Sequence, residues 1–241
     1  MPATKRSQKR SSILKWLLGG TFLVGVVVAV GVWYFFVRDD APPAAKLVER
    51  PTVAAKSGPD GSWTVAKNVD TFAGYRIKEH FGALDHTAVV RTPAVTGNLT
   101  LAGTKVGTVN VTADLTQAES KDTQPPGVFP VSNRIQSMRT DGLQTNQFPT
   151  AKFALSAPIT LAGAPKSGVP VSASATGQLT LHGVTKSVTI PIKARWNGKV
   201  IDVTGSVHIA LADYSITPPQ RNFVRVDNNG TIEFQVTFAK Q

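Results

Sequence analysis

The sequence contains no cysteine. Disulfide bonds and thiolate metal sites are therefore excluded, and an exported domain of this composition must take its stability from its core and its sheet. Acidic residues are also scarce, at 15 of 241. The sequence has no G-x-S-x-G, H-E-x-x-H or phosphate-loop pattern. We therefore expect no catalytic residue, no metal site and no resident cofactor, and the protein is not expected to be an enzyme.

Positive charge is plentiful but unevenly distributed along the chain. The formal net charge is +11, and residues 1–38 hold six Lys and Arg side chains and no acid. The remainder has 20 basic and 15 acidic residues, a net charge of +5. A nucleic-acid-binding domain normally gathers its basic residues on one face. The larger part of this chain is only mildly basic, so nucleic acid is not an expected partner.

The longest uncharged stretch is WLLGGTFLVGVVVAVGVWYFFV, at residues 16–37. As a helix it would be about 33 Å long, enough to cross a bilayer core of about 30 Å. It exceeds the apolar region of a secretory signal peptide and ends in bulky aromatics, so cleavage and a buried core helix are the less favoured interpretations. Basic residues before the stretch place residues 1–15 in the cytoplasm. The sequence thus predicts a single-pass signal anchor in the cell membrane, with an extracytoplasmic C-terminal part.

Residues 38–61 form a linker rich in Pro, Ala, Lys and Gly, with no sustained hydrophobic period. Such a composition is typical of a stalk with little structure of its own. The remaining residues, 62–241, are expected to form one domain outside the membrane.

Apolar residues in this outer domain fall repeatedly on every second position, which predicts half-buried antiparallel strands. Turn-forming sequences at 182–183, 197–199 and 228–230 separate the runs as hairpins would. A meander of this kind must close on itself or hide its edges. Ser132 and Asn133 predict the start of one short helix in the interruption between residues 125 and 149. The alternating runs lie at residues 95–101, 109–115, 171–181, 188–196, 201–211 and 232–238.

Six segments of the outer domain, taken together and in order, resemble the YceI-like family across residues 62–240. The resemblance implies an all-β fold: an eight-stranded antiparallel lipocalin-like barrel with an apolar pore that holds a polyisoprenoid or a similar amphiphile. Many relatives carry an Arg-Asp pair at the start of the helix, whereas here Arg134 is followed by Ile135. The segments are GYRIKEHF (74–81), VVRTPAVTGNLTL (89–101), FPTAKF (148–153), ATGQLTLHGVTKSVTIPIKA (175–194), ADYSITPP (212–219) and GTIEFQVTF (230–238).

The residues expected to line the pore are apolar and lie on the inward face of the predicted strands. Ordinary core packing at a closed end of the barrel would produce the same pattern, because alternation identifies the inner face but not its empty part. The candidates are Tyr75, Ile77, Phe81, Phe153, Ile190, Ile192, Trp196, Phe234 and Phe238.

The polar candidates are weaker. His182 falls at a predicted hairpin, where a structural hydrogen bond is the favoured role, and the four histidines have no metal-ligand spacing. Asp202 and Glu233 fall on the outward register and are expected to be solvated. Arg76 and Arg91 suit an anionic head group, although scattered surface charge explains them equally well.

The leading hypothesis is a membrane-anchored module that binds an isoprenoid lipid or a quinone-like amphiphile. A structural or interaction protein of the cell envelope with a fully packed barrel is the alternative, and an enzyme is the weakest. The sequence leaves a homodimer open.

Overall fold

The computed structural model describes residues 23–31, 33, 41–67, 70–82, 84–121, 131–221 and 224–241. The basic tail predicted at residues 1–15, and all of the predicted span at 16–37 except residues 23–31 and 33, lie outside this set. Residues 23–31 are helical with mostly exposed side chains. None of the helices among the described residues combines the length and apolar character needed to cross a membrane.

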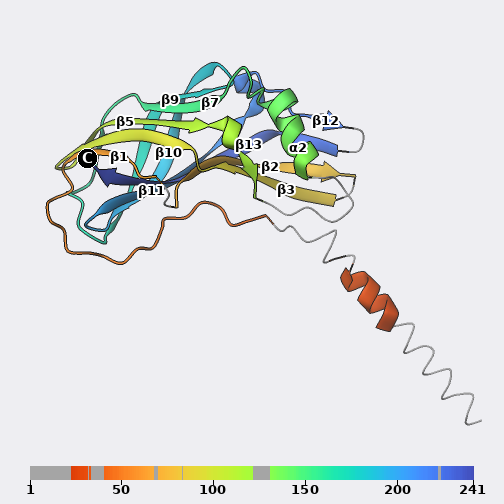
Figure 1. Cartoon of the computed structure of the whole chain (residues 1–241), viewed down its shortest axis with the longest axis horizontal. Coiled ribbons are helices and arrows are strands. Elements are labelled where there is room, and N and C mark those ends of the chain that lie inside the picture. The colour runs from red at the N-terminus through yellow and green to blue at the C-terminus, as the bar shows by residue number, and fades with distance from the viewer. Residues whose placement is uncertain are drawn as a thin grey trace, which may run out of the picture.

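Within the described residues, eight antiparallel strands close into a barrel because β1 pairs with both β4 and β13 (Figure 1). This agrees with the eight-stranded fold that the family resemblance implies. In pairing order the ring consists of β1 (Gly61–Val65), β4 (Val95–Ala102), β5 (Lys105–Asp114), β7 (Thr150–Leu155), β9 (Pro170–Leu181), β10 (Val184–Trp196), β11 (Val200–Ala210) and β13 (Val224–Lys240).

Further strands extend the sheet from this ring. β2 pairs with the first part of β13, β3 with β2, and β6 with β3. The short strands β8 and β12 pair with β5 and β13. Their bounds are β2 (Phe72–Phe81), β3 (Leu84–Thr92), β6 (Glu119–Ser120), β8 (Ile159–Thr160) and β12 (Gln220–Arg221). The helical segments are η2 (Leu115–Gln117), α2 (Val131–Ser137), η3 (Met138–Gly142) and η4 (Leu211–Tyr214).

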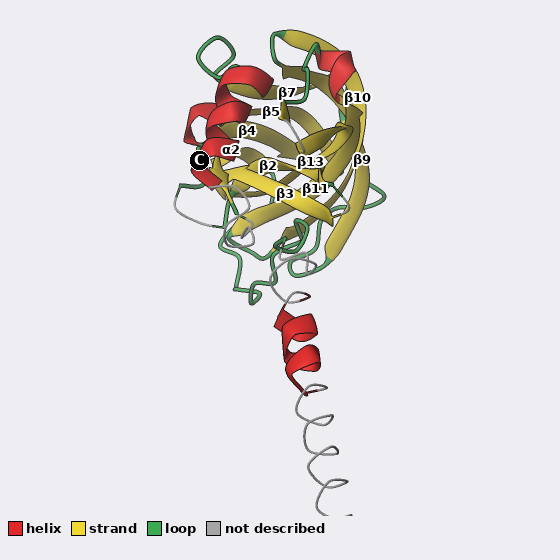
Figure 2. Cartoon of the chain, turned by 90° about the vertical axis from the view of Figure 1, so that its right-hand side faces the viewer, coloured by secondary structure: helices red, strands yellow, loops and turns green. Residues whose placement is uncertain are grey.

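The predicted helix is present, but it begins at Val131, before the two residues expected to cap it. It continues into the wider turn of η3, and α2 lies at one end of the barrel (Figure 2). We call this end the α2 end.

Two of the three predicted hairpin turns are confirmed. At the β9–β10 turn, His182 and Gly183 both have positive φ, the conformation that a tight two-residue hairpin requires. The turn predicted at residues 228–230 is wrong. These residues lie inside β13, where the register against β2 shifts between Val226 and Gly230. The residues between Val226 and Gly230 form a bulge in β13, and a bulge bends a strand without reversing its direction.

The inward-facing side chains form two apolar clusters, one toward each end of the barrel. The cluster at the α2 end includes Ile77, Leu179 and Tyr214. The other includes Trp63 and Phe238, which are almost completely buried. Each such side chain contributes about 1.5–3 kcal/mol when removed from water, so these clusters supply much of the stability that disulfides cannot.

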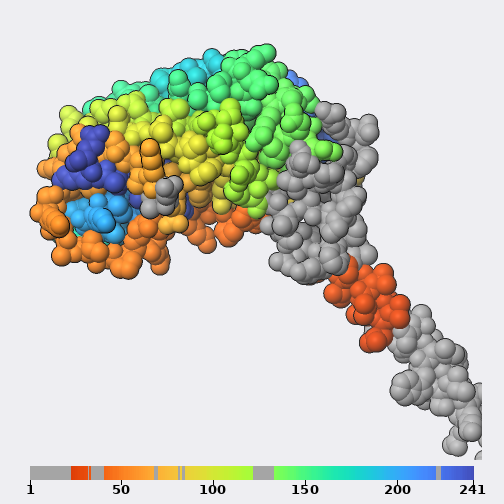
Figure 3. All heavy atoms as spheres, viewed as in Figure 1, coloured from red at the N-terminus to blue at the C-terminus, as the bar shows by residue number. Residues whose placement is uncertain are grey.

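Residues 41–60, which we call the strap, have no helix or strand but lie along the outside of the barrel (Figures 1 and 3). The sequence predicts a linker with little structure of its own; its described part has no helix or strand, and the structure shows that this part is held to the barrel. Hydrogen bonds join the strap to the barrel from Pro42 to Asp60. Sequence periodicity could not reveal this contact, because an irregular segment has no period.

Candidate functional site

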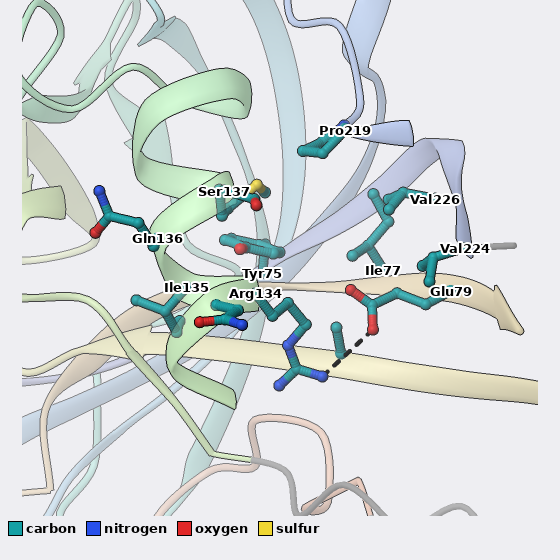
Figure 4. A pocket seen from close by; sticks show the side chains of 13 residues that line it. Tyr75, Ile77, Glu79, Arg134, Ile135, Gln136, Ser137, Pro219, Val224 and Val226 are labelled. Atoms are coloured by element: carbon teal, nitrogen blue, oxygen red, sulfur yellow. Dashed lines mark hydrogen bonds and ion pairs between the residues drawn. The ribbon is translucent and has the colours of Figure 1, made fainter. Parts of the chain in front are cut away.

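A cavity of about 330 Å³ lies at the α2 end, between α2 and the sheet (Figure 4). The sheet contributes apolar side chains such as Tyr75, Ile77 and Val226, and the helical segment contributes Ile135 and Met138. The polar residues of the lining are Glu79 from β2 and, from α2, Asn133, Arg134, Gln136 and Ser137. The cavity therefore has a mainly apolar wall and a polar rim on one side.

An ion pair connects α2 to the sheet at this cavity. Arg134 Nη1 lies 3.3 Å from Glu79 Oε2, and the two side chains are 11% and 5% exposed. Arg134 also donates to the hydroxyl of Ser120 in β6. Arg134 thus joins α2 to two strands, β2 and β6. Because both charges are largely removed from water, each depends on the other for its stability.

A second cavity, of about 130 Å³, lies in the middle of the barrel. Almost every lining side chain is apolar, and they come from β2, β5, β7, β9, β10, β11 and β13. Small residues such as Ala113, Ala151 and Ala175 leave this space open, while Phe153 and Phe234 border it. An apolar space of this kind favours hydrocarbon over water.

A third cavity, of about 80 Å³, lies toward the opposite end of the barrel. It shares Ile192 and Val203 with the middle cavity, so a single layer of side chains borders both spaces. Trp196 lines it and is itself buried. At least three hollows thus lie along the described interior, and side chains such as Ile192 and Val203 stand between two of them.

The structure brings the predicted pore residues to this interior. Tyr75 and Ile77 line the first cavity, and Phe153, Ile190, Phe234 and Phe238 line the second. Ile192 lines the second and third, and Trp196 the third. Phe81 ends β2, but its side chain lies outside the described residues. Ligand contact by these residues stays a prediction.

Sequence reasoning missed the polar part of the first cavity. Glu79 lies on the inward face between apolar residues, where alternation predicts an apolar side chain. Arg134 stands out in the sequence only because its neighbour departs from the family pattern. The one available signal was that an acid on an inward register needs a buried partner.

The expectation that Asp202 and Glu233 are solvated is wrong. Both have the predicted outward register, but each is only 1% exposed because the strap covers them. Arg76 and Arg91, considered for a lipid head group, instead face Glu233 on the outside of the sheet.

His182 has a structural environment. Its ring nitrogens lie 3.2 Å from the carbonyl of Tyr214 and 3.2 Å from Oε1 of Gln144, and Phe148 packs on the ring at 4.2 Å. Burial, and to a smaller extent Asp213, raises the pKa of Tyr214. Among the described residues no group of His, Asp and Glu side chains could hold a metal ion.

Comparison with known proteins gives a family match and structural neighbours. The sequence model of the YceI-like domain matches residues 63–238. No curated protein matches the sequence. A polyisoprenoid-binding domain from Saccharophagus degradans has a TM-score of 0.54 at 14% identity, covering 74% of this chain and 98% of that one.

Two further neighbours have lower TM-scores. BcnA of Burkholderia cenocepacia has a TM-score of 0.47 at 16% identity, covering 68% of this chain and 95% of its own. The YCEI protein of Campylobacter jejuni has a TM-score of 0.48 at 12% identity, covering 63% and 84%.

Proposed function

Because the chain belongs to the YceI-like family, we propose that it binds a lipid of polyisoprenoid type in its barrel, with the head group at the α2 end. The observation that carries the proposal is the row of three apolar cavities along the interior. The Saccharophagus degradans protein of the same fold is described as a polyisoprenoid binding domain, which supports the choice of ligand.

Hydrocarbon burial is strong enough to drive such binding. Each buried CH₂ contributes about 0.8 kcal/mol, so a five-carbon isoprene unit contributes up to about 3–4 kcal/mol. Three or four units contribute up to about 9–16 kcal/mol, which is of the same size as an association cost of about 4–15 kcal/mol. The lipid tail must displace the side chains that separate the three cavities, such as Ile192 and Val203, so binding requires rotamer changes along the interior.

The first cavity favours a head group of low charge. Its described charged residues, Arg134 and Glu79, neutralise each other. A multiply anionic head group would have to compete with Glu79 for the guanidinium. Asn133, Gln136 and Ser137 instead offer neutral hydrogen-bonding groups. A prenol or a quinone-like amphiphile fits this rim better than a diphosphate.

Location forms the second part of the proposal. The uncharged stretch at residues 16–37 is proposed to anchor the chain in the cell membrane, with the barrel outside the cytoplasm. An anchored barrel would take its ligand from the bilayer in which that ligand dissolves.

The middle cavity provides the sharpest test. Ala151 faces this cavity from β7, and Ala154 of the same strand is exposed on the outer face. Ala151→Leu should reduce retention of a polyprenol in native mass spectrometry because it fills the space that the tail requires, whereas Ala154→Leu should leave retention unchanged. Equal retention by both variants, with both folded, would refute binding in the interior.

The alternative of a structural envelope protein is favoured by one observation, the separation of the interior into three hollows. In that case purified barrel exposed to polyprenol would stay empty, and Ala151→Leu would only raise its stability by filling a void.

A further inference from the structure

The strap is held to the barrel along its whole length. Arg76 and Arg91 of the sheet donate to the carbonyls of Pro42 and Pro43, each at 2.7 Å. Arg195 donates to the carbonyl of Val48. At the other end of the strap, Asp60 Oδ1 accepts from the backbone of Gly103 at 2.9 Å. The strap thus begins beside β2 and β3 and ends beside the β4–β5 turn.

Glu233 of β13 is the first strong attachment point. Its Oε1 accepts from Nε and Nη2 of Arg91 at 2.9 and 2.7 Å, and its Oε2 accepts from the backbone N–H of Ala45 in the strap at 2.9 Å. A carboxylate that is 1% exposed must have its charge and lone pairs satisfied by the protein. Release of the strap would uncover this group and remove one of its donors.

Asp202 of β11 is the second attachment point, and here the cation comes from the strap itself. Arg50 Nε lies 3.1 Å from both carboxylate oxygens of Asp202, and Arg50 Nη2 lies 3.0 Å from Asp70. Thr237 donates to the same carboxylate at 2.7 Å. Without the strap, Asp202 would lose its cation while keeping its place in the sheet, which is a strongly unfavourable state unless water replaces Arg50.

The barrel surface is shaped to receive the strap. A Cβ built on Gly198 would lie 2.2 Å from the carbonyl oxygen of Val53, and one on Gly168 would lie 2.5 Å from the hydroxyl of Thr52. Both glycines have positive φ, so their turns also favour glycine for conformational reasons. The strap therefore occupies space where any other residue would place a side chain.

From these contacts we infer that the strap is an orienting tether that holds the α2 end of the barrel toward the membrane; the inference rests on the anchoring proposed above. A free linker over residues 38–60 could extend about 80 Å and let the barrel turn in any direction. With the strap docked, only residues 38–40 separate it from the apolar stretch, a span of at most about 10 Å.

The N-terminal end of the strap is also fixed at a defined place on the barrel. Pro42 is held by Arg76, whose neighbours in β2, Tyr75 and Ile77, line the first cavity. The opposite end of the barrel, at the β4–β5 turn, is where the strap finishes. A membrane segment that precedes the strap is thereby kept near the wall of the first cavity and away from the far end of the barrel.

The absence of cysteine allows a direct test with single-cysteine probes. Asn133→Cys reports on the α2 end and Thr104→Cys on the far end, and both positions are exposed. The full chain is placed in vesicles of phosphatidylethanolamine and phosphatidylglycerol that contain an acceptor-labelled lipid. Energy transfer from a donor dye on the cysteine to the acceptor-labelled lipid should be greater for position 133 than for position 104.

The strap is then released by combining Arg50→Ala with Glu233→Gln, and the difference between the two positions should be lost. Glu49→Gln, at an exposed position of the strap, is the matched control and should preserve the difference. Trypsin provides an independent readout, because Lys46, Arg50 and Lys56 should resist cleavage in the unaltered chain, and Lys46 and Lys56 should become cleavable in the double variant while the barrel stays intact.

Equal transfer from positions 133 and 104 in the unaltered chain would overturn the inference, as would an undiminished difference in the double variant that releases the strap. Polyprenol retention is measured on the chain without the cysteine substitutions, because Asn133 lines the first cavity. If the protein retains polyprenol but energy transfer is equal from both positions, only the orienting role is refuted. If the vesicles float without the protein, the anchoring on which that role depends is refuted.

Discussion

Glu233 is a buried carboxylate on the outer face of the barrel, and its contacts explain why it is buried there. The side chain joins β13, β3 and the strap through Arg91 and Ala45. We expect Glu233→Ala to lower the free energy of unfolding by about 3 kcal/mol, because it leaves Arg91 and Arg76 without their anion. Urea unfolding measures this change. Glu119→Ala, which breaks the exposed pair with Lys121, should produce no measurable change, and a similar loss in both variants would contradict the argument.

His80 gives the stability a pH dependence. Hydrogen bonds to Asp227, and secondly to Asp85, raise the pKa of His80 above its usual 6.5. A raised folded-state pKa means that the stabilisation is complete below pH 6.5 and disappears as the pH rises through the folded-state value. The difference in unfolding free energy between the native protein and His80→Gln should therefore shrink as the pH rises from 6.5 through the folded-state pKa of His80.

Two control variants test the cause of this pH dependence. Asp227→Asn should weaken it more than Asp85→Asn, because Asp227 is the larger influence on the pKa. NMR titration of the imidazole checks the pKa directly. A pKa at or below 6.5 in the native protein would show that the two carboxylates do not hold the protonated ring.

The β9–β10 hairpin depends on Gly183. Its φ is +74°, and a Cβ at this position would lie 2.7 Å from the Phe148 ring that packs on His182. Gly183→Ala should cost at least about 1–2 kcal/mol from backbone strain alone, with the ring displacement in addition. Gly163→Ala meets no neighbouring atom within 4 Å and should have little effect on thermal unfolding. Equal melting temperatures for the two variants would show that the turn tolerates a side chain.

Among the elements, alternation predicted six of the eight strands of the closed barrel, because each of these strands has one face toward the core and one toward water; the short strands β1 and β7 were not among the alternating runs. The turn-forming residues at 228–230 gave a wrong prediction, because Asn and Gly form a bulge within β13 there and not a turn. Local sequence cannot distinguish a turn from a bulge, since Asn and Gly suit both. The pairing of β13 with β2 determines which of the two forms. The strap was missed for a related reason: Arg50 meets Asp202 across 152 residues, and no local pattern encodes that contact.

For the barrel as a whole, ligand binding and stability are linked. A lipid that binds only the folded state at a free concentration about 100-fold above its Kd adds about 2.7 kcal/mol to the unfolding free energy. For a domain of this size we expect a rise in Tm of about 5–10 °C. Calorimetry with a detergent-solubilised polyprenol measures the rise, and the Ala151→Leu variant should show a smaller one. A detergent-only sample is the reference, and a Tm that never depends on polyprenol would contradict binding.

The last strand of the chain completes the architecture. β13 pairs with β1, β2, β11 and β12, so strands from both ends of the sequence meet on it. Glu233 and Thr237, which fasten the strap, also belong to it. During synthesis the earlier strands must therefore wait, with their apolar faces unpaired, until β13 has emerged from the ribosome. Nascent chains of this protein should depend on chaperones until β13 has been synthesised, and premature termination before β13 should yield aggregate instead of a smaller barrel.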